Sequence, residues 1–422
     1  MDLKVNTTDL TLGMYVCRLD RPWLETPFLM QGFYLEDEDD LRKVREHCRH
    51  VYIDTEPHDS TKRKAKSPAQ ALPIEKAADK RADPSLFVPE FTARSGLKKR
   101  RKIYPDTTTF AEEIEAAKEI KQELADATSA FIDGARSAKK MDISAAKVAV
   151  GKMTESILRN PDAFEWLRLL KSKDNYTYSH CWDASALAIA FGRHLGLSKG
   201  NLNELAMGAL MFDIGKIRVS QEILNKPGPL TPEEFTEVKK HVEHSIEIMA
   251  STKNLSDGAI AIAAVHHERH DGSGYPRGFR RTQIPVEGRI AGIVDCYDAI
   301  TCDRPHASAI SPHQAIRKLY AWRDTMFQAE LVEQFIQSIG VYPVGAIVEL
   351  STGEVGIIIS QNRVRRLRPT VLLVLDKHKT FYAEPPIIDL KDVPEDELGN
   401  NFEIVATLNP GSYGIDRNQY FL

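Results

Sequence analysis

The spacing of apolar residues divides the chain into three kinds of sequence. Residues 1 to about 57 alternate short apolar stretches with turns, which is typical of a small α+β domain. From about residue 105 to residue 340 apolar residues recur at helical spacing, which predicts a series of helices. Beyond residue 341 the period falls to two, and short apolar runs separated by Gly, Asn and Pro predict strands. The predicted fold is therefore mainly α, with a short β appendage at the C-terminal end.

Several helices of the central segment can be placed individually. Amphipathic runs cover residues 143–157, 178–195 and 203–212. A further helix is predicted to begin at Thr231, because Thr231 as N-cap, Pro232 in the first turn and Glu234 three residues on form a capping box. This helix is expected to continue through His241, with Phe235 on its inward, apolar face.

Composition separates these segments further. After the first domain, Lys, Arg, Ala, Pro and Ser replace the large apolar residues, so this stretch cannot bury enough surface to offset its ordering entropy. It is predicted to be a charged flexible linker. The five predicted parts are an α+β domain at 1–57, the linker at 58–104, a helical connector at 105–149, a helical domain at 150–341 and a β-rich appendage at 342–422.

Charge and composition argue against several classes of protein. A formal net charge of −4 argues against a general nucleic-acid or membrane-surface binder. A basic run at residues 98–102 could meet a phosphate-rich partner, but a solvated charged stretch is the favoured interpretation. No apolar run reaches the roughly 18 residues that a membrane span needs, and five scattered cysteines fit a reducing compartment. We therefore expect a cytoplasmic protein without a membrane span, and nucleic acid is an unlikely partner.

The stretch from His266 to Pro276 carries the first candidate chemistry. His266 and His267 end an apolar helical run and place two imidazole donors at one helix terminus. Gly272 and Gly274 follow, and glycine permits positive φ and close backbone approach. Because such histidine pairs are also common on surfaces and in cores, the interpretation depends on the rest of the chain.

Other polar residues interrupt the apolar faces of the central helices. These residues are His180, Asp213, His241 and Asp295. A carboxylate buried without a partner costs several kcal/mol, so Asp213 and Asp295 need a metal, a cation or hydrogen-bond donors. Taken singly, His180 and His241 are better interpreted as satisfied core or surface histidines. Together with the adjacent histidine pair, the four residues predict a metal site.

Several motifs between residues 150 and 345 carry a family resemblance. They are Asp174-x-Tyr176-Thr177-x-x-His180, Asp213-Ile214-Gly215-Lys216, the run from Ile223 to Thr231, His266-His267-Glu268-Arg269 with Asp271 to Pro276, and Asp295-x-x-Asp298-Ala299 with Asp303-Arg304-Pro305. In this combination the chain resembles the HD-GYP family of the HD phosphohydrolase superfamily. The resemblance implies an all-helical domain that hydrolyses cyclic di-GMP in bacterial signalling. Residues 1 to about 57 also resemble a small domain of unknown function often found ahead of HD-GYP domains.

The resemblance implies a centre for one or two divalent transition metals. The implied ligands of one metal are His180, Asp213 and Asp295, with Asp213 bridging to a second metal held by His241, His266 and His267. Imidazole and carboxylate ligands suit iron, manganese or zinc. Two metals can lower the pKa of a shared hydroxide and stabilise the attacking and leaving oxygens of a phosphoryl displacement.

The resemblance also implies contacts with the substrate. Lys216 would neutralise a phosphate oxygen beside the bridging Asp213, so these two are the predicted catalytic residues. Lys216, Arg304 and Tyr275 are the predicted substrate-binding residues, with Arg304 offering a second phosphate contact. Tyr275 could instead pack on the histidine pair, or the Gly-Tyr-Pro turn could meet a partner signalling protein. The base contacts have no readable motif, so cyclic di-GMP and cyclic GMP-AMP both remain open as the cyclic dinucleotide.

Two residues depart from the family pattern. Phe212 stands where the family has the histidine of its His-Asp pair, and a phenyl ring cannot ligate a metal. Ala307 stands where the family commonly has a basic residue. Two functions follow as hypotheses. The first is a metal-dependent phosphodiesterase, and the alternative is a degenerate domain that binds a metal, a nucleotide or a protein partner without efficient turnover.

Overall fold

The chain consists of two units in the computed structural model. The described residues are 2–12, 14–20, 33–35, 38–54, 102–136, 143–169, 176–302, 309–392 and 402–420. Contacts divide the chain into Met1–Val88 and Pro89–Leu422. Most of the predicted linker, up to residue 101, lies outside the described residues, and the five-part division of the chain stays a prediction.

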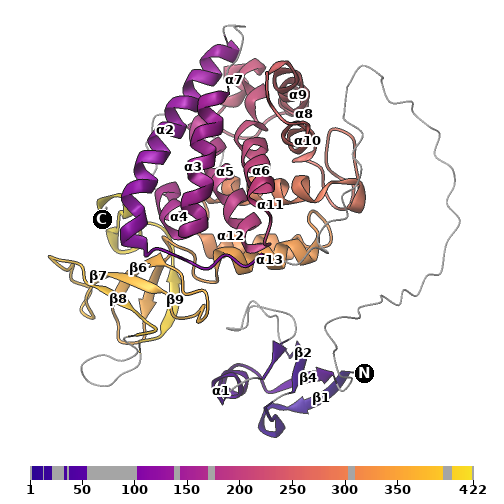
Figure 1. Ribbon diagram of the computed structural model, residues 1–422. Helices are drawn as coiled ribbons and strands as arrows, with labels where there is room; N and C mark the ends of the chain where they lie inside the picture. The colour runs from indigo at the N-terminus through magenta and orange to yellow at the C-terminus, as the bar shows by residue number, and fades with distance from the viewer. Residues whose placement is uncertain are drawn as a thin grey trace, which may run out of the picture. The chain divides into compact units, whose positions relative to one another are not determined.

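The N-terminal unit is a small antiparallel sheet with one helix beside it (Figure 1). Its elements are β1 (Asp2–Asn6), β2 (Tyr15–Leu19), β3 (Phe33–Tyr34), α1 (Glu38–His47) and β4 (His50–Asp54). The strand order is β1-β4-β2-β3. Val16, Leu35, Val44 and Val51 are fully buried between sheet and helix. This is the small α+β domain that the alternating pattern predicts.

The second unit is built mainly from helices packed in a single body. They are α2 (Phe110–Arg136), α3 (Ser144–Arg159), α4 (Pro161–Leu169), α5 (Tyr176–His194), α6 (Lys199–Met211), α7 (Gln221–Leu224), α8 (Pro232–Lys239), α9 (His241–Ser251), α10 (Asp257–Val265), α11 (Val286–Thr301), α12 (Pro312–Ala321) and α13 (Ala329–Ile339), with a 3-10 turn η3 at Ile214–Arg218. Helix α5 runs through the middle, where Ala184, Leu187, Ile189 and Phe191 are all buried. Buried side chains lie on every face of α5, which is expected of a helix surrounded by other helices.

The predicted capped helix differs from the expected one. Thr231 and Glu234 do form the reciprocal capping box at the start of α8. The helix ends at Lys239, however, and His241 begins a separate helix, α9, with Lys240 as the junction. Phe235 points outward with 46% of its surface exposed, so its predicted place on an inward face is wrong. His241 is buried, although Phe235 on the preceding helix faces solvent.

The C-terminal β appendage is a five-stranded antiparallel sheet. Its strands are β5 (Ile347–Leu350), β6 (Val355–Ser360), β7 (Thr370–Leu375), β8 (Ile387–Asp389) and β9 (Ile404–Leu408), in the order β8-β7-β6-β5-β9. One buried carboxylate on a helix binds residues of this sheet and of the loop after β6. Asp162 in α4 accepts hydrogen bonds from Ser360 Oγ and the Gln361 amide, each at 2.8 Å, and pairs with Arg363. The sheet is therefore joined to the helical body by polar contacts inside the interface.

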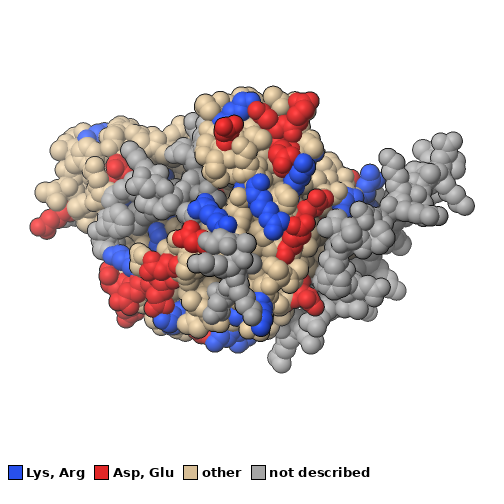
Figure 2. All heavy atoms as spheres, turned by 90° about the horizontal axis from the view of Figure 1, so that it is seen from above, with Lys and Arg blue, Asp and Glu red and all other residues tan. Residues whose placement is uncertain are grey.

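Charge on the outside of the molecule is mixed. Figure 2 shows acidic and basic side chains interspersed over the described part of one face, as the near-balanced composition implies. Within the described residues, no helix combines the length and apolar character of a membrane span. The expectation that nucleic acid is not a partner stays a prediction.

Candidate metal centre

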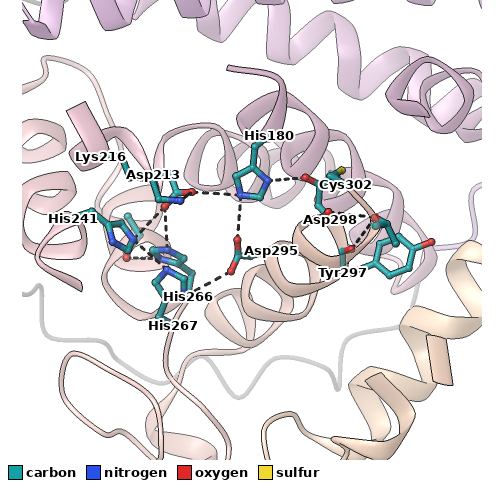
Figure 3. Close-up of polar contacts among 12 residues, drawn as sticks. His180, Asp213, Lys216, His241, His266, His267, Asp295, Tyr297, Asp298 and Cys302 are labelled. Atoms are coloured by element: carbon teal, nitrogen blue, oxygen red, sulfur yellow. Dashed lines mark hydrogen bonds and ion pairs between the residues drawn. The ribbon is translucent and has the colours of Figure 1, made fainter. Parts of the chain in front are cut away.

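The predicted ligands converge in the interior of the helical body (Figure 3). His180 comes from α5, Asp213 from the turn after α6, His241 from the start of α9 and Asp295 from α11. His266 and His267 follow the last residue of α10. All six lie close enough to form two overlapping groups of donor atoms that share Asp213. The inward placement that helical spacing predicts is therefore present for each of them.

The first group consists of His180, Asp213 and Asp295. His180 Nε2 lies 3.2 Å from Asp295 Oδ1 and 3.4 Å from Asp213 Oδ2. All three side chains are buried. They supply one imidazole nitrogen and two carboxylates to a common point, a set suited to a divalent transition metal.

The second group consists of Asp213, His241, His266 and His267. His241 Nε2 lies 3.2 Å and His266 Nε2 3.8 Å from the same oxygen, Asp213 Oδ1. His267 Nε2 lies 3.2 Å from His241 Nε2. Donor atoms of all four residues lie within 4.8 Å of one another. The two oxygens of Asp213 face different groups, Oδ2 toward His180 and Oδ1 toward His241 and His266.

Backbone carbonyls orient two of these imidazoles. His241 Nδ1 donates to the Val238 carbonyl and His266 Nδ1 donates to the Ala263 carbonyl, each at 2.7 Å. A neutral imidazole that donates through Nδ1 has its lone pair on Nε2. Both lone pairs are therefore directed toward Asp213, as in metal sites where a second hydrogen bond fixes the ligand tautomer.

Two buried atoms of this group lack a hydrogen-bond partner. They are Asp213 Oδ1 and His266 Nε2, which face each other although both are acceptors. Buried polar atoms are rarely left unsatisfied, because each costs about 1–3 kcal/mol. A cation between them removes this cost, so the residues present fit a divalent metal.

Electrostatics at the site favour added positive charge. Burial lowers the pKa of the His180 imidazole, but hydrogen bonds to Asp213, Asp295 and Asp298 more than offset this and raise it well above its ordinary value. Burial also lowers the pKa of His267 well below its ordinary value. In Asp213, burial is outweighed by Lys216 and the neighbouring histidines, which hold its pKa well below the usual range. The Asp213 carboxylate is thus held ionised and the His267 imidazole neutral, as metal ligands must be, whereas the surrounding carboxylates favour a protonated His180, which would have to lose its proton to bind a metal.

Close backbone approach allows the Asp213 turn to reach α9. A Cβ atom added at Gly215 would lie 2.1 Å from the His241 carbonyl oxygen and 2.5 Å from the Ser245 amide. The Gly215 amide instead donates to Ser245 Oγ at 2.8 Å. Glycine at this position therefore lets Asp213 and His241 meet. Lys216, one residue further on, donates to Asp213 Oδ2, so its ammonium already lies at the centre.

Phe212 lies between the two groups of ligands. It is fully buried, and its ring centroid is 4.5 Å from that of His266 and 5.8 Å from that of His180. A side chain here adjoins ligands of both groups, but a phenyl ring offers no lone pair. The first group consequently has three protein donors, whereas the second has four.

A polar network supports His180 from behind. His180 Nδ1 donates to Asp298 Oδ2 at 2.6 Å (Figure 3), and Asp298 Oδ1 accepts from Arg168 at 2.9 Å. Asp298 and Arg168 are 1% and 3% exposed, so this is a buried charge pair. We did not predict either role from the sequence. Asp298 could have been found, because it follows Asp295 by three residues on the same helix face. Arg168 lies 130 residues away from Asp298 and gives no local signal.

The Gly-Tyr-Pro turn packs against the histidine pair. The Tyr275 ring stacks on the His267 ring with centroids 4.6 Å apart, and the Tyr275 amide donates to the His267 carbonyl at 3.2 Å. Glu268 holds the exit of the turn by accepting from the amides of Arg277 and Phe279. Of the alternatives for Tyr275, the structure therefore places it on the histidines. Its predicted contact with substrate stays a prediction.

The two glycines of the turn have different roles. Gly272 has a positive φ of 83°, as expected, whereas Gly274 does not. A Cβ atom at Gly274 would lie 2.4 Å from the Arg269 amide and 2.5 Å from the His267 carbonyl oxygen. Gly274 is thus required by close approach to the backbone beside the ligands.

Gly274→Val is expected to push the turn away from His267 and to weaken nucleotide binding or the association with a partner protein, because the added side chain meets backbone atoms of Arg269 and His267. We expect a loss of about 10-fold or more in affinity, of the size reported for changes around metal ligands. Titration calorimetry with cyclic di-GMP would measure it, and circular dichroism should show the helices unchanged. Wild-type affinity in the variant would contradict this role of the turn.

Arg304 and Ala307 lie outside the described residues, as does Asp174. The predicted phosphate contact of Arg304 is therefore a prediction only. The other predicted site residues, namely His180, Asp213, Lys216, His241, His266, His267, Tyr275 and Asp295, are brought together as described above.

Comparison with family models covers most of the chain. Residues 149–331 match an HD domain, residues 2–146 match a domain of unknown function (DUF3391), and residues 347–395 match a KOW domain associated with HD domains. The DUF3391 match extends well beyond the first 57 residues, through the linker and most of the helical connector.

Several curated proteins are similar in sequence. The cyclic di-GMP phosphodiesterase PA4108 of Pseudomonas aeruginosa is 32% identical over 390 residues, which cover 92% of this chain and 88% of the relative. A cyclic di-GMP phosphodiesterase of Thermotoga maritima is 35% identical over 180 residues, 41% of this chain and 49% of the relative. A 3'3'-cGAMP-specific phosphodiesterase 2 of Vibrio cholerae is 35% identical over 143 residues, 34% of this chain and 27% of the relative.

Proposed function

Since the chain belongs to the HD-GYP family of cyclic di-GMP phosphodiesterases, we propose that its buried histidine and aspartate cluster is the active site and that it hydrolyses cyclic di-GMP. The observation that carries this proposal is the shared ligand Asp213. Its two oxygens face two groups of donor atoms, as a carboxylate does when it bridges a pair of metals. Hydrolysis of a phosphodiester by paired metals uses this arrangement.

A divalent metal centre would supply positive charge for the phosphate and a water activated as nucleophile. Iron, manganese and zinc all suit the nitrogen and oxygen donors present. Four residues would hold the second site, and three would hold the first. We therefore propose that the second site binds metal more tightly, and that the first is completed by water.

The remaining residues of the site orient the ligands and the substrate. Lys216 offsets the charge of Asp213 and lies where it could donate to a phosphate oxygen. Asp298 holds His180 with Nε2 toward the centre, and Arg168 in turn holds Asp298. Tyr275 covers His267 and limits the access of water to that side. Asp298, Arg168 and Tyr275 thus act on the histidine ligands, whereas Lys216 would contact the substrate.

One observation favours a second candidate function. The Phe212 ring stands beside His180 and His266, where it supplies no ligand and fills space next to the first group. If that group holds no metal, the domain would bind a cyclic dinucleotide through the second site without efficient turnover. Metal content and turnover distinguish this candidate from the phosphodiesterase.

The purified protein is expected to carry at least one transition metal per chain and to hydrolyse cyclic di-GMP. Elemental analysis after anaerobic purification would measure the metal. Hydrolysis of cyclic di-GMP, cyclic GMP-AMP and cyclic di-AMP in parallel would identify the substrate. Protein that is free of metal would contradict the metal centre. Metal-bound protein that binds cyclic di-GMP but leaves it intact would favour the second candidate.

A further inference from the structure

An exposed aromatic ring stands at the rim of the metal centre. Phe235 in α8 has 46% of its surface exposed. Its ring makes an edge contact with Tyr275, with centroids 6.1 Å apart. Tyr275 in turn stacks on His267 and lies 6.5 Å from His241. Phe235 is therefore separated from two predicted metal ligands by a single ring.

A cation lies beside the same ring. Lys239, one helical turn after Phe235, places its ammonium 5.1 Å from the Phe235 centroid and 6.0 Å from the Tyr275 centroid. The three side chains form a rim cluster of Phe235, Lys239 and Tyr275 that combines a half-exposed aromatic ring with an ammonium donor. Aromatic rings bind nucleobases by stacking, and an ammonium can donate to O6 and N7 of guanine.

We propose that Phe235 and Lys239 bind a guanine base of the substrate, with the base stacked on the Phe235 ring and the Lys239 ammonium donating to its O6 and N7. The inference rests on the proposed function, because it concerns the substrate of the same site. It assigns base recognition to α8, whereas the metal ligands and Lys216 act on the phosphates. Adenine carries an amino donor in place of O6, so Lys239 would favour guanine over adenine.

A nucleobase fits this cluster better than a protein partner does. Protein interfaces use contiguous apolar patches. The residues one turn away from Phe235 along α8 are Thr231, Pro232, Val238 and Lys239, and the Val238 side chain is half-buried, so Phe235 is the one large apolar side chain exposed on this helix. A single aromatic ring flanked by polar groups and a cation has instead the size and chemistry of a site for one base.

Paired variants test the two residues separately. Phe235→Leu keeps an apolar side chain but removes the aromatic face, whereas Phe235→Trp retains it. Lys239→Met removes the ammonium and keeps much of the side-chain length. Phe381→Ala and Lys118→Met serve as matched controls, because Phe381 is 52% exposed in the C-terminal part of the chain and Lys118 lies on α2, paired with Glu115.

Binding of cyclic di-GMP without added metal, measured by titration calorimetry, gives a readout that does not depend on turnover. Phe235→Leu is expected to lower the affinity for cyclic di-GMP about 5- to 20-fold, in line with the loss of one base stack. Phe235→Trp is expected to keep the wild-type affinity. In Phe235→Leu, KM for cyclic di-GMP should rise to a similar extent, while hydrolysis of bis-para-nitrophenyl phosphate, which has no purine, should be unchanged. Lys239→Met should lower the ratio of the affinity for cyclic di-GMP to the affinity for cyclic di-AMP.

The outcomes separate this inference from the proposed function. If the wild type hydrolyses cyclic di-GMP and Phe235→Leu binds it with wild-type affinity, the inference about the base is wrong and the proposed function stands. Equal losses on cyclic di-GMP and on the purine-free diester would also overturn it, because Phe235 would then act on the centre rather than on the base. Binding that depends on Phe235 without turnover would support the inference and overturn the phosphodiesterase.

Discussion

Asp213→Ala is expected to remove metal from both sites and to lower the rate of cyclic di-GMP hydrolysis by at least about 100-fold. Even residues that only orient metal ligands cost about 10- to 100-fold in affinity or activity when they are changed. Asp213 faces both groups of donors, so its loss should exceed that range. Elemental analysis and a hydrolysis assay of the same sample would measure both effects.

The controls for this variant follow from the burial of Asp213. Asp392→Ala changes an aspartate that is exposed in a turn and should leave metal and rate unchanged. Asp213→Asn keeps the side-chain volume but loses the charge, and it separates a missing ligand from a cavity. An Asp213→Ala protein that still binds two metals and turns over would show that the ligands are elsewhere.

Phe212→His is expected to raise the metal content toward two per chain and to increase the rate. The new imidazole would stand beside His180 and His266, where the phenyl ring stands now, and would give the first group a fourth protein ligand. A gain of about 10- to 100-fold would match the size of other ligand effects, provided that the imidazole is oriented correctly. Small errors in position can cost as much as ~100-fold in rate.

Phe212→Leu is the matched control, because it reduces the bulk of the ring without adding a donor. A gain in Phe212→His alone would identify the missing ligand as the defect, whereas a gain in both variants would identify crowding. Wild-type protein that already holds two metals and turns over rapidly would contradict the premise. Water or another side chain would then complete the first site, and Phe212 would be harmless.

Much of the helical body, and the inward placement of the histidines and aspartates that cluster within it, could be predicted from the sequence. Helical spacing and the capping box at Thr231 are local signals, and the start of α8 confirms the latter. The inward direction of Asp213 and Asp295 also followed from local patterns, because they interrupt apolar faces. What local patterns could not give was the end of α8 at Lys239 and the start of a separate α9 at His241, since helical spacing continues on both sides of Lys240. The outward direction of Phe235 was missed for the same reason.

Contacts between distant parts of the chain gave no signal in the sequence. The Arg168–Asp298 pair joins α4 to α11, and neither residue has a neighbour in the sequence that predicts the other. Phe212, in contrast, was recognised as unusual from the sequence. The family pattern identified it as a departure, but only the structure reveals that its ring contacts imidazoles from both ligand groups.

The carboxylate of Asp162 limits how this chain can be divided or recombined. A cut near residue 341 looks natural from the change in hydrophobic period, yet it would remove the donors that β6 and the following loop supply to Asp162, which is 1% exposed in the intact chain. Hydrogen bonds to a charged group contribute about 1.5–3 kcal/mol each, and Ser360, Gln361 and Arg363 all donate to this carboxylate, so their sum is a large part of the stability of an ordinary domain. The helical body and the C-terminal sheet should therefore melt in one cooperative transition, and neither can serve as an interchangeable cassette in an engineered fusion unless Asp162 is replaced as well.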